Sequence, residues 1–246
     1  MANWNDPQPR TGFGASPSLG GRTDARAGYD AGLRRHMLSI YNYMTSGVLL
    51  SGIVAVLFAQ SGFAAQVLTT PLRWVIMLAP LGFVMAMSFG ANRMKTSTLQ
   101  ALFWGFAIVM GLSLSSIFLV FTGASIATTF FATAAAFAGL SLVGYTTKKD
   151  LSAMGSFLIM GVVGILVAML INLFVQSSVL QLAISVLGVL IFAGLTAYDT
   201  QRLKQQYFQL AGTDFAGKAI VLGALSLYLD FINMFQFLLS FMGQRD

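Results

Sequence analysis

Long apolar runs separated by short polar segments are the dominant pattern along this chain. The runs are apolar on every side rather than at alternate positions, which favours helices over the strands of a membrane barrel. About 20 apolar residues suffice for a helix to cross a bilayer while satisfying its own backbone hydrogen bonds. The pattern predicts an all-α polytopic membrane protein with seven transmembrane helices, over residues 37–60, 74–91, 99–121, 124–146, 154–176, 180–200 and 219–242.

The first segment of the chain differs from the rest. Residues 1–32 are rich in Gly, Ser, Pro, Arg and Asp, with few large apolar side chains. Such a segment cannot bury enough surface to offset the entropy lost on ordering. We therefore predict a disordered cytoplasmic tail over residues 1–32 and one seven-helix transmembrane domain over residues 33–246.

The positive charges indicate how the chain is oriented. The formal net charge is +6, and all basic residues except Arg73 and Arg245 precede the first span or lie in the second, fourth and sixth connections. The positive-inside rule then predicts a cytoplasmic N-terminus and an external C-terminus, which an odd number of spans also requires. Because orientation accounts for the charge, no nucleic-acid partner is expected.

Composition excludes several kinds of chemistry. The chain is 57% apolar and 9% charged, unlike a soluble domain, and it contains no cysteine and no glutamate. The single histidine, His36, stands beside two arginines at the membrane edge, where a solvated residue is favoured over a metal ligand. HExxH and GxGD motifs and an interior lysine in the last span are all absent. We therefore expect neither an enzyme nor a bound cofactor.

A carboxylate lies inside the last apolar run. An ionisable side chain near the bilayer centre costs at least about 2.5–3.5 kcal/mol on insertion scales, so it normally faces protein or water and serves a function. Asp230 belongs to a polar stripe that should face the bundle interior, which predicts a central last helix. A structural hydrogen bond to Asn233 or to a neighbouring serine is the alternative role. At 100° per residue the stripe comprises Gly223, Ser226, Asp230, Asn233, Phe237 and Ser240.

A second carboxylate, Asp199, ends the sixth apolar run. If that helix continues to Lys204, Asp199 lies about 7–8 Å below the interface, whereas Asp230 lies about 16 Å below the start of its own span. Contact between the two is therefore left open, and Asp199 could instead form an interfacial ion pair with Arg202 or Lys204. Arg93, which ends the second span, could reach either carboxylate or extend to the lipid headgroups.

Two carboxylates that meet in a dry pocket cannot both ionise cheaply. They would share one proton and titrate together in two steps. Protonated, the pair would join the last two helices; deprotonated, it would repel itself and attract a cation. Even with Ser226 and Asn233 as supporting polar residues, Asp199 and Asp230 offer fewer oxygens than the six to eight that Ca²⁺ prefers. Weak binding of a passing Ca²⁺ is therefore predicted.

Three segments resemble a known family. They are GYTTKKDLSAMGSFLIMG from Gly144 to Gly161, AYDTQ from Ala197 to Gln201, and LSLYLDFIN from Leu225 to Asn233. They resemble the bacterial form of the Bax-inhibitor family, also called the transmembrane Bax inhibitor motif family, from about residue 33 to residue 243.

The resemblance implies a bacterial inner-membrane protein with seven helices and the last helix at the centre. It also implies a proton-sensitive calcium leak in which Asp199 and Asp230 form the pH sensor and Arg93 latches to the pair. Spans one to three and four to six would have opposite orientations, which predicts two three-helix layers around the last helix.

Two functions remain open. The first is a pH-sensitive calcium leak channel, whose partners would be the lipid bilayer, calcium ions and protons, with a monomer favoured. The alternative is a regulatory protein that binds other membrane proteins, such as a membrane-bound AAA protease with which other bacterial relatives are associated. In that case Asp199 and Asp230 would serve stability alone, so cation flux that depends on both residues would separate the two functions.

Overall fold

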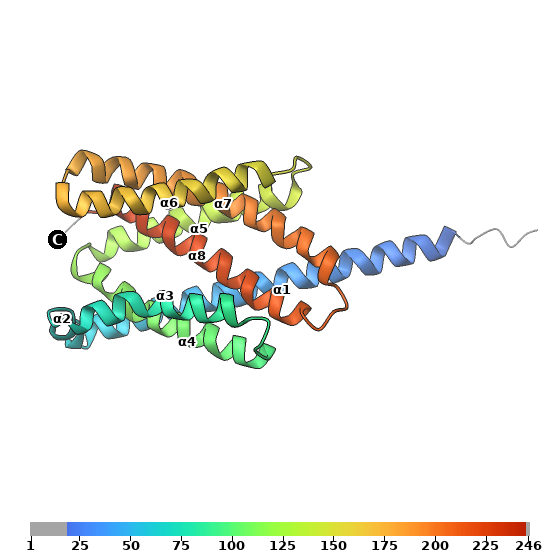
Figure 1. The fold of residues 1–246 in the computed structure, drawn as a ribbon, viewed down its shortest axis with the longest axis horizontal. Coiled ribbons are helices and arrows are strands. Elements are labelled where there is room, and N and C mark those ends of the chain that lie inside the picture. The colour runs from blue at the N-terminus through green and yellow to red at the C-terminus, as the bar shows by residue number, and fades with distance from the viewer. Residues whose placement is uncertain (1–18, 245–246) are drawn as a thin grey trace, which may run out of the picture.

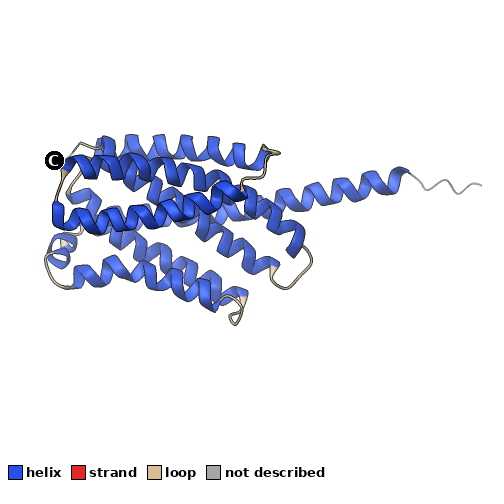
Figure 2. Cartoon of the chain, turned by 45° about the horizontal axis from the view of Figure 1, so that its top comes forward, coloured by secondary structure: helices blue, strands red, loops and turns tan. Residues whose placement is uncertain are grey.

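The computed structural model describes residues 19–244, and in this part of the chain helices are joined by short loops, with no strand (Figure 2). Seven helices are long and apolar enough to cross a membrane, which confirms the predicted number and order of spans. They are α1 (Leu19–Gln60), α3 (Leu72–Gly90), α4 (Thr96–Leu114), α5 (Gly123–Thr146), α6 (Ser152–Val175), α7 (Ser178–Leu210) and α8 (Ala216–Met242).

The connections are short, and several begin or end helices in recognisable ways. A short helix, α2 (Phe63–Leu68), joins α1 to α3, and a 3-10 turn over Ser115–Leu119 extends α4. Thr122 and Ser177 start α5 and α7, because each hydroxyl accepts a hydrogen bond from a backbone N–H three residues later, at 3.2 and 3.3 Å. These caps satisfy donors that the first helical turn leaves unpaired.

Two helices are longer than the predicted spans. α7 continues ten residues past the predicted end at residue 200, to Leu210. α1 begins at Leu19, and its part before Ala31 projects beyond the bundle (Figure 1). The predicted tail over residues 1–32 is thus helical from Leu19 onward, and residues 1–18 lie outside the described residues. Its disorder stays a prediction.

One end of the bundle carries the α3–α4, α5–α6 and α7–α8 loops, together with the projecting part of α1 (Figure 1). Arg93, Lys148 and Lys149 lie in these loops and Lys218 lies in the first turn of α8, so we call this the basic end. Arg73 lies at the opposite end, near the start of α3. This arrangement agrees with the predicted orientation, which itself stays a prediction.

α8 is the central helix, as its polar stripe predicted. In the apolar 18-residue stretch of α8, 61% of the residues are buried, whereas the corresponding share in every other span is at most 33%. It crosses the bundle obliquely and contacts α1, α3, α4, α5 and α7 (Figure 1). Among the described residues no backbone contact joins α6 to α8, because α6 packs on α7 instead. The finer description of two three-helix layers stays a prediction.

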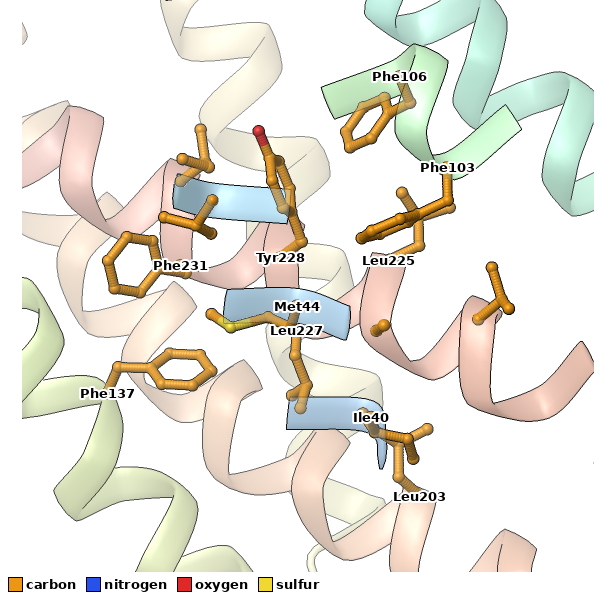
Figure 3. Close-up of a cluster of buried hydrophobic side chains, with 14 of the residues drawn as sticks. Ile40, Met44, Phe103, Phe106, Phe137, Leu203, Leu225, Leu227, Tyr228 and Phe231 are labelled. Atoms are coloured by element: carbon orange, nitrogen blue, oxygen red, sulfur yellow. The ribbon is translucent and has the colours of Figure 1, made fainter. Parts of the chain in front are cut away.

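Aromatic and aliphatic side chains from several helices pack around α8 (Figure 3). Tyr228 is fully buried, with its ring edge-on to those of Phe103 and Phe106 on α4. Its hydroxyl lies 2.6 Å from the hydroxyl of Ser51 on α1, which donates to the carbonyl of Ala107 at 2.6 Å. One polar cluster in an apolar core therefore ties α1, α4 and α8 together.

The expectation of a solvated His36 is wrong. The residue is only 8% exposed, and its ring lies 5.3 Å from that of Tyr207 on α7. The physical reason is the unexpected length of α7, whose last turns cover the side of α1 on which His36 lies. The polar residues after Asp199 indicate that this helix could continue, but they do not indicate its length or its contact with α1.

Candidate functional site

Hydrogen bonds to α1 and to the α5–α6 loop hold the AYDTQ segment of α7. Thr200 is fully buried, and its hydroxyl lies 3.4 Å from that of Tyr41 on α1. Gln201 accepts from the backbone N–H of Leu151 at 2.9 Å and donates to the carbonyl of Lys149 at 2.8 Å, which fixes the α5–α6 loop. These contacts anchor the turn of α7 that carries Asp199.

Two glycines let the neighbouring helices approach this turn closely. A Cβ on Gly144 of α5 would collide with the backbone carbonyl of Ala197, and one on Gly155 of α6 would collide with the ring of Tyr198. The GYTTKKDLSAMG and AYDTQ segments therefore pack directly against each other. Small residues permit such approach between membrane helices, where close packing drives association.

Asp199 lies on α7, is 8% exposed and forms an ion pair with Arg202, one helical turn later. The distance between Arg202 Nη1 and Asp199 Oδ1 is 3.4 Å. This pair matches the alternative role considered for Asp199 from the sequence. Because the Arg202 side chain is 41% exposed, solvent screens its charge, and it compensates the carboxylate only in part.

Asp230 lies on α8, is 5% exposed, and its charge interacts with those of Asp199 and Arg202. Its Oδ2 atom is buried and has no hydrogen-bond partner among the described residues. Asn233 does not supply one, because its Nδ2 donates to the carbonyl of Leu229 at 2.8 Å. A buried carboxylate oxygen without a partner is energetically costly.

The structure thus brings Asp199 and Asp230 into one electrostatic neighbourhood at the α7–α8 interface, the most extensive helix contact in the bundle. Ser226 and Asn233 are partly buried on α8, on either side of Asp230. Arg93 is exposed in the α3–α4 loop, and no ion pair joins it to either carboxylate within the described part of the chain. The latch role of Arg93 stays a prediction.

Sequence reasoning considered Arg202 only as an interfacial partner of Asp199 and assigned no place in the site to Gln201. The signal for Arg202 was its spacing of three residues from Asp199, which places both on one helix face. No local signal could identify Gln201, because its partners lie about fifty residues earlier in the chain.

A cavity of about 310 Å³ lies between α3, α7 and α8, toward the basic end. Ser88, Arg202, Gln206 and Ser226 contribute its polar lining. Its lining on α8 extends to Leu229, the residue directly before Asp230.

A second cavity, of about 360 Å³, lies beyond Asp230 between α6, α7 and α8. Asn233, Gln236 and Ser240 of α8 and Gln181 of α7 line it. A third cavity, of about 430 Å³, lies at the α6–α7 loop and shares Gln181 with the second. Along α8, Asp230 therefore lies between the residues that line the cavity at the basic end and those that line the second cavity, although it lines neither itself.

Asp150, an acidic residue of the α5–α6 loop at the basic end, belongs to a different environment. Its Oδ1 accepts from the backbone N–H and the hydroxyl of Ser152, at 2.9 and 2.7 Å, in the exposed loop before α6. These hydrogen bonds lower the pKa of Asp150 below its usual value. Its carboxylate therefore stays charged at neutral and mildly acidic pH.

Comparison with known proteins gives the same family as the sequence motifs. Residues 33–246 match the family model described as inhibitor of apoptosis-promoting Bax1. An uncharacterized protein of Caulobacter vibrioides is 50% identical over 228 residues, covering 87% of this chain and 90% of the relative. The inner membrane protein YbhL of Escherichia coli is 42% identical, covering 91% and 97%. The chain therefore belongs to the Bax-inhibitor family and is a membrane protein with seven candidate spanning helices.

Proposed function

We propose that this protein is a cation leak of the bacterial inner membrane, with Ca²⁺ as the transported ion and a proton on Asp199 and Asp230 as the gate. The observation that carries the proposal is the burial of Asp230 between two cavities, with one oxygen unpartnered and Asp199 beside it. The name of the relative YbhL supports the inner-membrane location.

The closed state follows from the chemistry of a carboxylate pair. One proton held between Asp199 and Asp230 removes their mutual repulsion and supplies a hydrogen bond across the α7–α8 interface. It also satisfies the buried oxygen of Asp230. With the two helices joined at this level, the cavity at the basic end has no connection to those beyond Asp230.

The open state follows from loss of that proton. Two adjacent negative charges then repel each other, and the partly screened charge of Arg202 compensates for only one of them. The repulsion loosens the α7–α8 contact and creates an attractive site for a cation. Flux is therefore expected to rise as pH rises and to fall as the pair becomes protonated.

Weak binding suits passage rather than storage of the ion. No cluster of three or more His, Cys, Asp or Glu side chains occurs in the described residues, so the pair supplies only two carboxylates. Ca²⁺ prefers six to eight oxygen ligands, and water must supply the remainder. Conduction requires such a balance, because a tightly held ion does not leave.

The direct test is Ca²⁺ uptake into proteoliposomes that contain an encapsulated calcium indicator, measured over a range of pH. Uptake by the natural chain should rise with pH, and the Asp199→Asn, Asp230→Asn double variant should lose that rise. Asp150→Asn and His36→Gln are matched controls that should keep it. Uptake at the level of empty liposomes, or an unchanged pH response in the double variant, would contradict the proposal.

One observation favours the alternative function, binding of another membrane protein such as an AAA protease. α1 projects beyond the bundle from Leu19 to Ala31 at the basic end, where a soluble domain of a partner could reach it (Figure 1). Removal of residues 1–30 should abolish capture of such a partner while Ca²⁺ uptake continues. Loss of uptake in that variant would instead tie the segment to the leak.

A further inference from the structure

A long groove opens on the side of the bundle between α1 and α5. Its volume is about 730 Å³, and Phe231 of α8 forms part of its floor. No backbone contact joins α1 to α5 among the described residues, so the groove separates the two helices. Leu38, Leu49 and Leu142 on its rim are at least half exposed, which places the opening toward the lipid.

The lining of this groove becomes less polar with distance from the basic end. Arg34 and Tyr145 line it at the basic end, and the Lys204 ammonium donates to the Tyr145 carbonyl at 2.8 Å. Ser141 lies one helical turn deeper, is 6% exposed, and its buried hydroxyl has no hydrogen-bond partner among the described residues. Beyond Ser141 the lining is mainly hydrocarbon, as at Val48.

That order matches a phospholipid, and we propose that the groove binds one anionic phospholipid. Its phosphate lies at Arg34, an ester carbonyl accepts from Ser141, and one acyl chain runs along α1 toward Leu49. Arg and Lys side chains near the membrane surface attract anionic headgroups. The buried Ser141 hydroxyl has no partner among the described residues, and rotation of its side chain toward the groove lets it donate to the ester carbonyl.

The length of the groove suits a lipid that enters from one membrane surface. From Arg34 to Leu49 the groove follows fifteen residues of α1, a rise of about 22 Å. This length exceeds the roughly 15 Å of one hydrocarbon leaflet and leaves room for a headgroup at the basic end. A partner helix in the groove is an outcome that the first experiment below distinguishes.

The bound lipid would contact residues next to both carboxylates. Phe231, which follows Asp230, lines the groove, and Tyr41, which also lines it, lies 3.4 Å from the hydroxyl of Thr200 beside Asp199. The lipid site itself does not depend on the proposed leak, because it is defined by groove shape and charge. Its test therefore measures lipid binding rather than flux.

The first experiment is native mass spectrometry of the purified full chain after exchange into detergent with equal amounts of phosphatidylglycerol and phosphatidylcholine. The natural chain should retain one phosphatidylglycerol molecule. Ala138→Trp fills the groove from α5 and should abolish retention, whereas Ala136→Trp, on the same helix outside the groove, should not. Equal retention by these two variants would overturn the proposal, as would a dimer that Ala138→Trp disrupts.

Charge is tested with neighbouring arginines. Arg34→Gln should weaken phosphatidylglycerol binding about fivefold, the effect of one basic side chain near the surface, while Arg35→Gln, outside the groove, should not. Equal affinity of the natural chain for both lipids would refute the anionic preference.

A measurement on the natural chain keeps the proposal testable even if the tryptophan variants do not fold. Phosphatidylglycerol with a photoreactive group in its acyl chain should crosslink, in liposomes, to peptides of α1 and α5 that line the groove. Crosslinks spread evenly over all lipid-facing helices would contradict a specific site.

Discussion

At the scale of single residues, the two carboxylates differ in how they are compensated. Asp199 has Arg202 as an ion-pair partner at 3.4 Å, whereas one oxygen of Asp230 has no partner among the described residues. A buried negative charge is energetically more costly when no positive group lies close enough to neutralise it. The deeper residue should therefore control protonation of the pair.

We expect Asp230→Asn to weaken the pH dependence of Ca²⁺ uptake more than Asp199→Asn does. In the Asp230 variant the remaining Asp199 keeps its arginine, so uptake should be nearly constant between about pH 5 and 8, where histidine alone ordinarily changes its charge. Uptake into proteoliposomes at matched protein density measures this. Equal effects of the two substitutions, or the reverse order, would refute the ranking.

The buried hydroxyl of Tyr228 should contribute to the stability of the folded protein. Tyr228→Phe removes the hydroxyl that lies 2.6 Å from Ser51, which should cost about 0.6 kcal/mol and at most about 1.7 kcal/mol, as for other hydrogen bonds between membrane helices. Unfolding of the purified chain in mixed micelles measures the loss. Tyr198→Phe is the control, because no hydrogen bond of its hydroxyl is recorded among the described residues. A larger loss in the control would contradict the assignment.

At the scale of helices, the contact between α5 and α7 fixes the turn that carries Asp199. Gly144 faces the backbone of Ala197, and a backbone atom cannot move aside as the end of a flexible side chain can. The contact therefore transmits any change in the packing of α5 directly to the AYDTQ segment.

We expect Gly144→Ala to destabilise the protein by about 1–3 kcal/mol, the usual cost of overpacking. Gly139→Ala on the same helix has open space around its Cβ and should be neutral or stabilising by up to about 1 kcal/mol, because alanine favours helix. Thermal unfolding of both variants in detergent gives the comparison. Similar melting temperatures for the two variants would show that the α5–α7 approach is looser than described.

At the scale of the whole molecule, the seven spans could be predicted because apolar length is a local property of the sequence. Each predicted run coincides with a helix to within a few residues, apart from the ends of α1 and α7. Those ends depend on tertiary partners, such as Tyr145 for Lys204 and the ring of Tyr207 for His36. Local apolarity carries no information about such contacts.

The candidate site was only partly predictable for the same reason. Asp230 and its stripe follow from helical periodicity, which requires one helix alone. Whether Asp199 lies near it depends on the oblique crossing of α8 and on the length of α7, and both are set by packing. The partnership of Arg202, rather than Arg93, with Asp199 likewise depends on side-chain geometry.

Orientation in the membrane gives a prediction for the molecule as a whole. The chain has no cysteine, so a maleimide labels only the cysteine that a variant introduces. Lys148→Cys at the basic end should resist a membrane-impermeant maleimide in intact cells, because basic loops stay in the cytoplasm. Ser178→Cys at the opposite end should react. Reaction of the first variant and protection of the second would reverse the predicted orientation.

The most direct measurement of the gate is an infrared titration of the protein in lipid vesicles, with Ca²⁺ uptake recorded on the same preparation. We expect a protonated-carboxyl band that is absent from Asp230→Asn and that disappears over the pH interval in which uptake begins. A band that persists through that interval, or uptake that begins without any change in carboxyl protonation, would contradict the account.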